Sequence, residues 1–174
     1  MHFPIYRDKN GELITERDEF FQLANKDQPN RGLVMMFDKS KDLALVRVEF
    51  VPKGVEYMAI ARADVTPGNM VHAVGNSPVA GSLWTYSSGT VRQYVRRTYM
   101  VGGPEGIPFE IDAKIIEATM HSNPADSGGP LVNHRGDLVG VTQSYSSEGR
   151  NVTTYIDARE ANALIERNFE RRGE

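Results

Sequence analysis

Residues 123–132 carry the side chains best suited to chemistry, a serine followed by two glycines between strand-like runs. Ser127 offers a hydroxyl that becomes a nucleophile once a base takes its proton. The glycines allow positive φ angles and close approach of a substrate backbone. A sharp turn can also aim the N–H groups of Ala125, Asp126 and Ser127 into one concavity, as an oxyanion hole requires. A glycine-rich hairpin with an exposed serine is the alternative interpretation of the isolated pattern.

The wider context favours the nucleophile. D-S-G-G-P-L-V at residues 126–132 resembles the nucleophile motif of trypsin-like serine peptidases, especially of their HtrA-like branch. Other blocks keep the family's order and spacing, so that the resemblance covers residues 38–160. They are D-L-A-L at 42–45, V-H-A-V-G-N at 71–76, Trp84 with S-G-T-V at 88–91, and I-D-A-R-E at 156–160.

The resemblance implies two six-stranded antiparallel barrels with the active site between them. It implies Ser127 as nucleophile and Asp42 as the residue that orients a histidine base. It also implies that His121 and Ser144 contact the substrate, an extended polypeptide that pairs with the strand at 141–145. We expect Asp42 to lie near Ser127 and to be largely buried, because residues 44, 46 and 48 are predicted to face a core. No cofactor is implied.

The identity of the base is left open by the sequence. Of the four histidines only His2 precedes Asp42, but it lacks the preceding strands and turn typical of the family's histidine. Either His2 is the base, or the base lies upstream of the chain, which would then also lack the first strands. In the second case we expect poor peptide hydrolysis or none. We predict a structural role for His72 and a hairpin-turn position for His134.

Composition excludes several classes of protein. The 174 residues correspond to one domain, and a net charge of −3 disfavours nucleic acids and anionic membranes as partners. The lack of cysteine excludes a disulfide scaffold and a cysteine nucleophile, and no ligand spacing indicates a metal site. We find no membrane-spanning apolar run and no signal peptide in residues 1–10. The compartment is left open by the sequence, and export of a longer bacterial parent protein is an expectation.

Hydrophobic alternation between turn residues predicts an all-β fold. The predicted strands cover residues 33–37, 43–50, 57–61, 70–74, 83–86, 90–95, 109–118, 131–132, 138–145 and 153–156. A short helix is predicted over 16–26 with Thr15 as N-cap, and an amphipathic one after a capping box at Asp157 and Glu160. We assign residues 1–52 to the remnant of an incomplete first barrel, and 53–174 to a complete second barrel with its closing helix.

Two functions are consistent with these sequence features. The first is a serine endopeptidase that works through an acyl-enzyme on Ser127. The alternative is a non-catalytic peptide-binding module with the same fold and an incomplete triad. If the first barrel lacks strands, amide hydrogen exchange should be slower over 90–141 than over 33–50, because the edges of the first barrel are unpaired.

Overall fold

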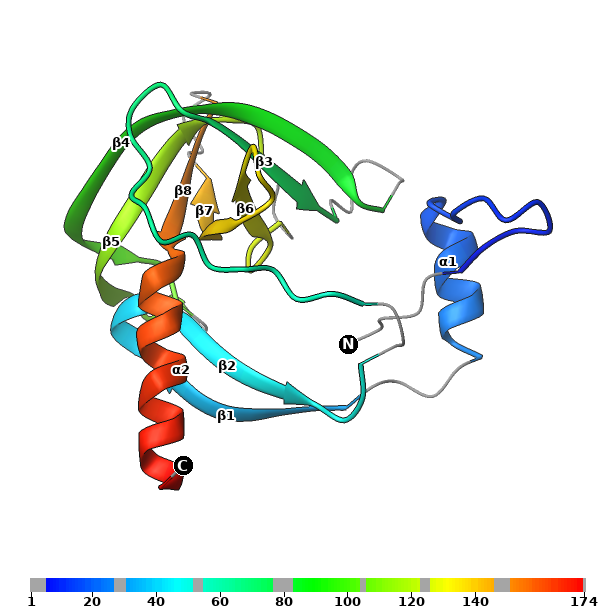
Figure 1. The fold of residues 1–174 in the computed structure, drawn as a ribbon, viewed down its shortest axis with the longest axis horizontal. Helices are drawn as coiled ribbons and strands as arrows, with labels where there is room; N and C mark the ends of the chain where they lie inside the picture. Colours follow the sequence, from blue (N-terminus) through cyan, green and yellow to red (C-terminus); the bar gives the residue numbers. More distant parts are fainter. Residues whose placement is uncertain are drawn as a thin grey trace.

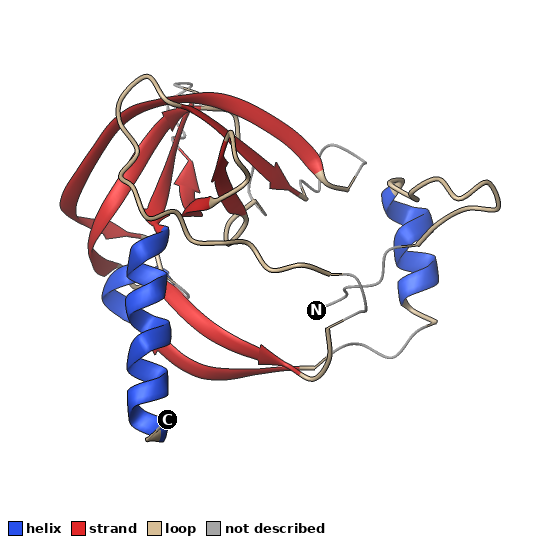
Figure 2. Ribbon diagram, viewed as in Figure 1, coloured by secondary structure: helices blue, strands red, loops and turns tan. Residues whose placement is uncertain are grey.

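The computed structural model describes residues 6–26, 31–51, 55–76, 83–103, 106–122, 126–145 and 151–173. Strands dominate this part of the chain, and the main helix lies near its C-terminal end (Figure 2). The predicted all-β fold with a closing helix is therefore confirmed. No helix in these ranges is long and apolar enough to cross a membrane.

A closed antiparallel barrel forms the larger part of the molecule (Figure 1). Its strands are β3 (Met70–Gly75), β4 (Thr85–Val101), β5 (Phe109–Thr119), β6 (Pro130–Asn133), β7 (Leu138–Tyr145) and β8 (Val152–Asp157). They close in the order β3-β4-β5-β8-β7-β6. The interior is filled by apolar side chains from several strands, among them Val71, Val91, Ile116, Ala118, Leu131, Val139 and Tyr155.

A separate two-stranded sheet precedes the barrel. It consists of β1 (Gly32–Asp38) and β2 (Leu43–Val48), joined by the short 3₁₀ helix η1 (Lys39–Lys41). The predicted buried face of β2 is wrong: Ala44 and Val46 are exposed, whereas Leu43 is buried. The reason is the neighbouring structure, because Leu43 and Leu45 pack in a cluster with Ile111, Ala113, Ile115, Ile156 and Leu164.

The helix α2 (Ala158–Arg172) follows β8 directly. Asp157 caps it by accepting a hydrogen bond from the Arg159 N–H, as the sequence predicts. The other half of the predicted capping box is not formed, because Glu160 accepts from the Lys114 N–H of β5 instead. The Arg167 guanidinium contacts the Asp38 carboxylate at 2.7 Å and so ties α2 to the sheet of β1 and β2.

A small unit before β1 packs around α1 (Arg17–Ala24). Glu16 caps this helix through the N–H groups of the first turn, so the prediction of Thr15 as N-cap is wrong. Thr15 instead uses its carbonyl to accept from the Leu83 N–H. Phe20 contacts the ring of Trp84 edge to face, which joins the unit to the start of β4.

Two other strand predictions differ from the structure. Residues 57–61 form no strand, and only Ile60 makes an isolated bridge, to Leu138. The predicted strands at 83–86 and 90–95 are parts of one long strand, β4. The first strand of the closed barrel is β3, which begins at Met70. The division of the chain into two parts at residue 52 stays a prediction.

Candidate active site

Ser127 lies exposed in the turn that enters β6. The next residue, Gly128, has φ +83°, a left-handed conformation that favours glycine. Its N–H donates to the Thr142 carbonyl at 2.8 Å, and the Thr142 N–H donates to the Gly129 carbonyl at 2.9 Å. Backbone hydrogen bonds to β7 therefore fix the position of the loop that carries Ser127.

Asp126, the residue before the serine, packs against Gly75 at the end of β3. A methyl group added at Gly75 would collide with the carboxylate of Asp126. The Gly129 N–H donates to the Asp126 carbonyl at 2.9 Å, which closes the turn around Ser127. Gly75 thus provides the space in which the nucleophile loop packs.

Asp42 occupies the left-handed position (φ 53°) that ends η1. Its side chain is exposed, so the prediction that it is largely buried is wrong. The physical reason is its place at the end of a short turn, where the following strand buries Leu43 instead. The Gln143 side-chain amide of β7 donates to Asp42 Oδ2 at 3.3 Å.

A second hydrogen bond continues from Gln143 to β4. The Tyr99 hydroxyl donates to Gln143 Oε1 at 3.3 Å. Burial, and then the negative charge of Asp42, raise the pKa of Tyr99 to about 12. The hydroxyl therefore stays protonated and able to donate at any physiological pH.

Strand β7 joins the two halves of this arrangement. Thr142 holds the loop of Ser127 by its backbone, and the adjacent Gln143 contacts Asp42 with its side chain. Thr142 therefore holds the two glycines that follow the predicted nucleophile, and the adjacent Gln143 contacts the predicted orienting aspartate.

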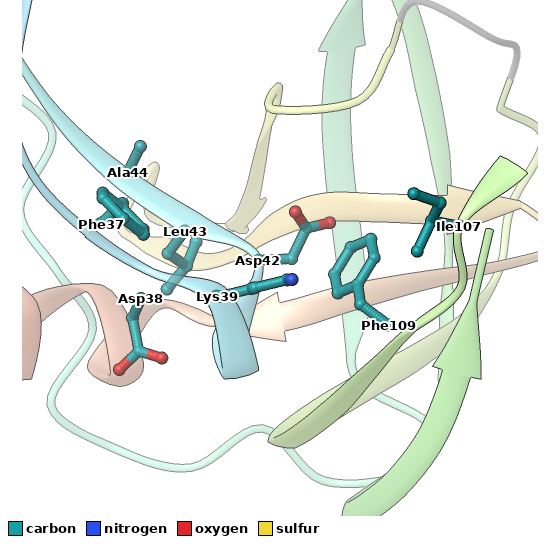
Figure 3. A pocket seen from close by; sticks show the side chains of 8 residues that line it. All are labelled: Phe37, Asp38, Lys39, Asp42, Leu43, Ala44, Ile107 and Phe109. Atoms are coloured by element: carbon teal, nitrogen blue, oxygen red, sulfur yellow. The ribbon is translucent and has the colours of Figure 1, made fainter. Parts of the chain in front are cut away.

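Asp42 also borders a cavity of about 590 Å³ between the sheet of β1 and β2 and the start of β5. Figure 3 shows its side chain beside the ring of Phe109. Asp38 also lines this cavity, but its carboxylate pairs with Arg167. Burial opposes the ionisation of Asp38, whereas Arg167 and Ser40 favour it and lower its pKa below the ordinary value. The cavity is lined by Phe37, Asp38, Lys39, Asp42, Leu43, Ala44, Ile107 and Phe109.

No hydrogen bond connects Asp42 with a histidine of the described residues. His121 is exposed and borders a small crevice together with Asp126 and Thr142. His72 stacks on Tyr86, with Nδ1 2.6 Å from the Tyr86 hydroxyl, in line with the predicted structural role. His134 lies in the predicted turn between β6 and β7.

Some predicted site residues fall outside the described part of the chain. They are His2, Ala125 and the side chain of Ser144. Within the described residues, no group of three His, Asp or Glu side chains could hold a metal ion. Gln143 and Tyr99 were not predicted; Gln143 adjoins the predicted Ser144, whereas no sequence signal marks Tyr99.

A family model described as a trypsin-like peptidase domain matches residues 7–141. The chain is 31% identical over 156 residues to "Protease Do-like 1, chloroplastic" of Arabidopsis thaliana, covering 82% of this chain and 33% of that protein. It is 29% identical over 143 residues to a "Probable periplasmic serine endoprotease DegP-like" of Pseudomonas fluorescens, covering 80% and 27%. The chain thus spans a third or less of the length of these relatives.

Solved structures show the same fold. The Rv3671c protease from M. tuberculosis in its active form superposes with a TM-score of 0.70 at 21% identity, over 80% of this chain and 59% of that chain. The HtrA-type protease AlgW with a decapeptide superposes with a TM-score of 0.64 at 19% identity, over 95% and 44%. Since the family model covers most of the chain, the protein belongs to the trypsin-like peptidase family, and its relatives place it in the HtrA-like branch of serine proteases.

Proposed function

We propose that this chain carries the nucleophile and the orienting aspartate of a serine endopeptidase, Ser127 and Asp42. The observation that supports this most directly is their shared attachment to consecutive residues of β7, Thr142 and Gln143. Family membership supplies the expectation of peptide-bond hydrolysis. The closed barrel of β3–β8 corresponds to the second barrel of the predicted fold, and β1 and β2 to part of the first.

In the proposed reaction, Ser127 Oγ attacks the carbonyl carbon of the scissile peptide bond while a histidine takes its proton. The backbone N–H groups of Ala125, Asp126 and Ser127 stabilise the oxyanion. The Ser127 N–H supports this assignment, because no described residue accepts a hydrogen bond from it. The tetrahedral intermediate collapses, the amine leaves with the proton from the histidine, and water hydrolyses the acyl-enzyme.

No histidine of the described residues is hydrogen-bonded to Asp42. His72 pairs with Tyr86, and the residues that line the cavity beside Asp42 include no histidine. His2 and a histidine outside the given sequence are the two candidates for the base. The cavity beside Asp42 offers the space for an imidazole ring that donates to the carboxylate.

An extended peptide is the proposed substrate, and β7 offers the edge to bind it. Within the described strands, β6 pairs with β7 only as far as Val141. Among the described strands Ser144 and Tyr145 pair with β8 alone, and their other edge is the one proposed to bind a substrate main chain. His121 would border the pocket for a substrate side chain. The name of the Pseudomonas relative suggests an exported bacterial protease.

A peptide-binding module without catalysis is the second candidate, favoured by the lack of a histidine near Asp42 among the described residues. The test is labelling of Ser127 by a fluorophosphonate, together with casein hydrolysis, for the native sequence, Ser127→Ala and His2→Ala. We expect Ser127→Ala to abolish any labelling and turnover. Turnover lost in both variants assigns His2 as the base, and turnover lost only in Ser127→Ala assigns another base. Retained hydrolysis in Ser127→Ala would overturn the proposal.

The binding candidate requires its own measurement. We expect a Ser127→Ala chain to retain peptide binding, measured by fluorescence anisotropy of labelled casein fragments, because β7 is unchanged. Binding with no labelling or turnover in the native sequence would favour the second candidate over the first.

A further inference from the structure

Tyr99 is connected to Asp42 through the side chain of Gln143. We infer that Tyr99 is a positioning residue for the proposed site, which orients the Gln143 amide so that its nitrogen faces the Asp42 carboxylate. This inference rests on the proposed function, since the orientation of Asp42 matters only where Asp42 directs a base.

The two hydrogen bonds give the amide one allowed direction. The Tyr99 hydroxyl donates to Gln143 Oε1, and Gln143 Nε2 donates to Asp42 Oδ2, both at 3.3 Å. An amide oxygen only accepts and an amide nitrogen only donates. A rotated amide would place its oxygen against the carboxylate oxygen of Asp42, so the arrangement is self-consistent only as observed.

The three residues come from three different elements. Tyr99 lies on β4, Gln143 on β7, and Asp42 directly after η1. Tyr99 also packs in the apolar cluster that contains Leu43 and Leu164, which holds its ring in place. Because the tyrosine is anchored in this cluster, it can fix the longer and more flexible Gln143 side chain.

The electrostatic surroundings keep Tyr99 a donor. Burial and the charge of Asp42 raise its pKa to about 12, the charge of Glu117 acts in the same direction, and that of Arg97 opposes it. Gln143, by contrast, carries no charge. The neutral Tyr99 hydroxyl, the neutral Gln143 amide and the Asp42 carboxylate are therefore connected in one chain of hydrogen bonds.

The hydrogen bond from Gln143 to Asp42 Oδ2 restricts the rotation of the carboxylate and so sets the direction of its other oxygen, Oδ1. With Oδ2 held by Gln143, Oδ1 of Asp42 accepts from no described residue. Asp42 borders the cavity beside Phe109 (Figure 3). A base bound in that cavity would meet a carboxylate whose rotation Tyr99 has already restricted through Gln143.

The first test measures the coupling without catalysis. In the full chain labelled with ¹³Cζ-tyrosine, the Tyr99 signal is assigned by its loss in Tyr99→Phe and then titrated by NMR. We expect Asp42→Asn to lower the pKa of Tyr99 from about 12 toward its ordinary value of 10.0, because a negative charge is removed. Gln143→Leu should lower it too, because the neutral phenol loses its acceptor.

Tyr94 provides the matched control. It lies on the same strand, and its hydroxyl donates to Asp157 at 2.7 Å rather than toward Asp42. Its signal should not respond to Asp42→Asn or Gln143→Leu. An unchanged Tyr99 pKa in Gln143→Leu, or equal responses of both tyrosines to Asp42→Asn, would overturn the inference.

The second test measures the consequence for catalysis. Loss of one neutral hydrogen bond predicts that Tyr99→Phe lowers kcat about three- to tenfold with KM unchanged. Tyr94→Phe should lower thermal stability but leave kcat unchanged at temperatures where the protein is folded. An equal kcat in Tyr99→Phe and the native sequence would overturn the positioning role. If the native sequence shows no turnover, as we expect where the base lies outside this chain, the NMR titration still decides whether Tyr99 orients the amide, and fluorophosphonate labelling of Ser127 decides the proposed function.

Discussion

The barrel of β3–β8 and the sheet of β1 and β2 differ in how many neighbouring strands each strand pairs with and in how well their apolar side chains are buried. Every barrel strand pairs on two sides, and Val71, Leu131 and Ile116 inside it are 0–1% exposed. In the sheet, each strand has one partner among the described residues, and Val34 and Phe37 are 56% and 70% exposed. The element that carries Ser127 therefore has its own core, whereas the element that carries Asp42 depends on its surroundings.

Contacts to the barrel and to α2 supply that support. Leu43 packs on the barrel side of β2, and the carboxylates of Asp38 and Glu160 take part in ion pairs across the boundary, with Arg167 and Lys41. The two proposed catalytic residues therefore sit on parts of unequal stability.

The largest effect should be a difference in the free energy of unfolding between substitutions in the barrel and substitutions in the sheet of β1 and β2. Ile116→Ala removes a side chain from the closed core, so we expect the free energy of unfolding to fall by about 2–5 kcal/mol. Val34→Ala on β1 should change it by less than about 0.5 kcal/mol, because that side chain is exposed. Urea unfolding followed by circular dichroism measures both. Similar losses would show that the sheet of β1 and β2 is covered as well as the barrel is.

A smaller effect should come from the packing of the nucleophile loop. Gly75→Ala brings a methyl group against the Asp126 carboxylate, and overpacking of this kind costs about 1–3 kcal/mol. We expect Ser127 to lose reactivity toward fluorophosphonates as the loop is displaced. Gly102→Ala is the matched control, because an added methyl group there has nothing within 4 Å. Equal labelling rates in the two variants would show that Asp126 moves aside without shifting Ser127.

The smallest effect should be a loss of stability of the sheet of β1 and β2 at acidic pH. Arg167 and Ser40 lower the pKa of Asp38 below 3.8, so its contribution to stability is present above that pH and is lost as the pH falls through the lowered pKa. The loss should be about 1 kcal/mol or less, because Arg167 is half exposed. Hydrogen exchange should therefore speed up in β1 and β2 more than in β5 on acidification toward pH 3, after correction for the intrinsic pH dependence. Arg167→Ala should remove this difference, and an unaltered difference would assign it to another group.

Much of the barrel could be predicted because its signals are local. Strand β7 has the predicted bounds, since its apolar and β-branched residues lie between clear turns. The buried face of β2 could not be predicted in the same way, because Leu43 and Val46 lie on opposite faces and both are apolar. The choice between the faces depends on α2 and β5, which are distant in sequence.

The candidate site shows the same limit. The residues around Ser127 form a compact motif, and the left-handed Gly128 follows from the two glycines in it. Gln143 contacts Asp42 across 101 positions of sequence, and Tyr99 contacts Gln143 across 44. No local spacing encodes such contacts, since they arise only when the barrel closes beside η1.

The attachment of both site halves to adjacent residues of β7 also limits how this strand can change in length. Gln143 lies at an irregularity in the pairing of β7 with β8, between Thr142 and Ser144. Inserting or deleting one residue before Thr142 would move other residues into positions 142 and 143, and would detach the Ser127 loop and Asp42 together. Substitutions along β7 can be judged one at a time, but single-residue insertions and deletions there act on the whole site as a unit.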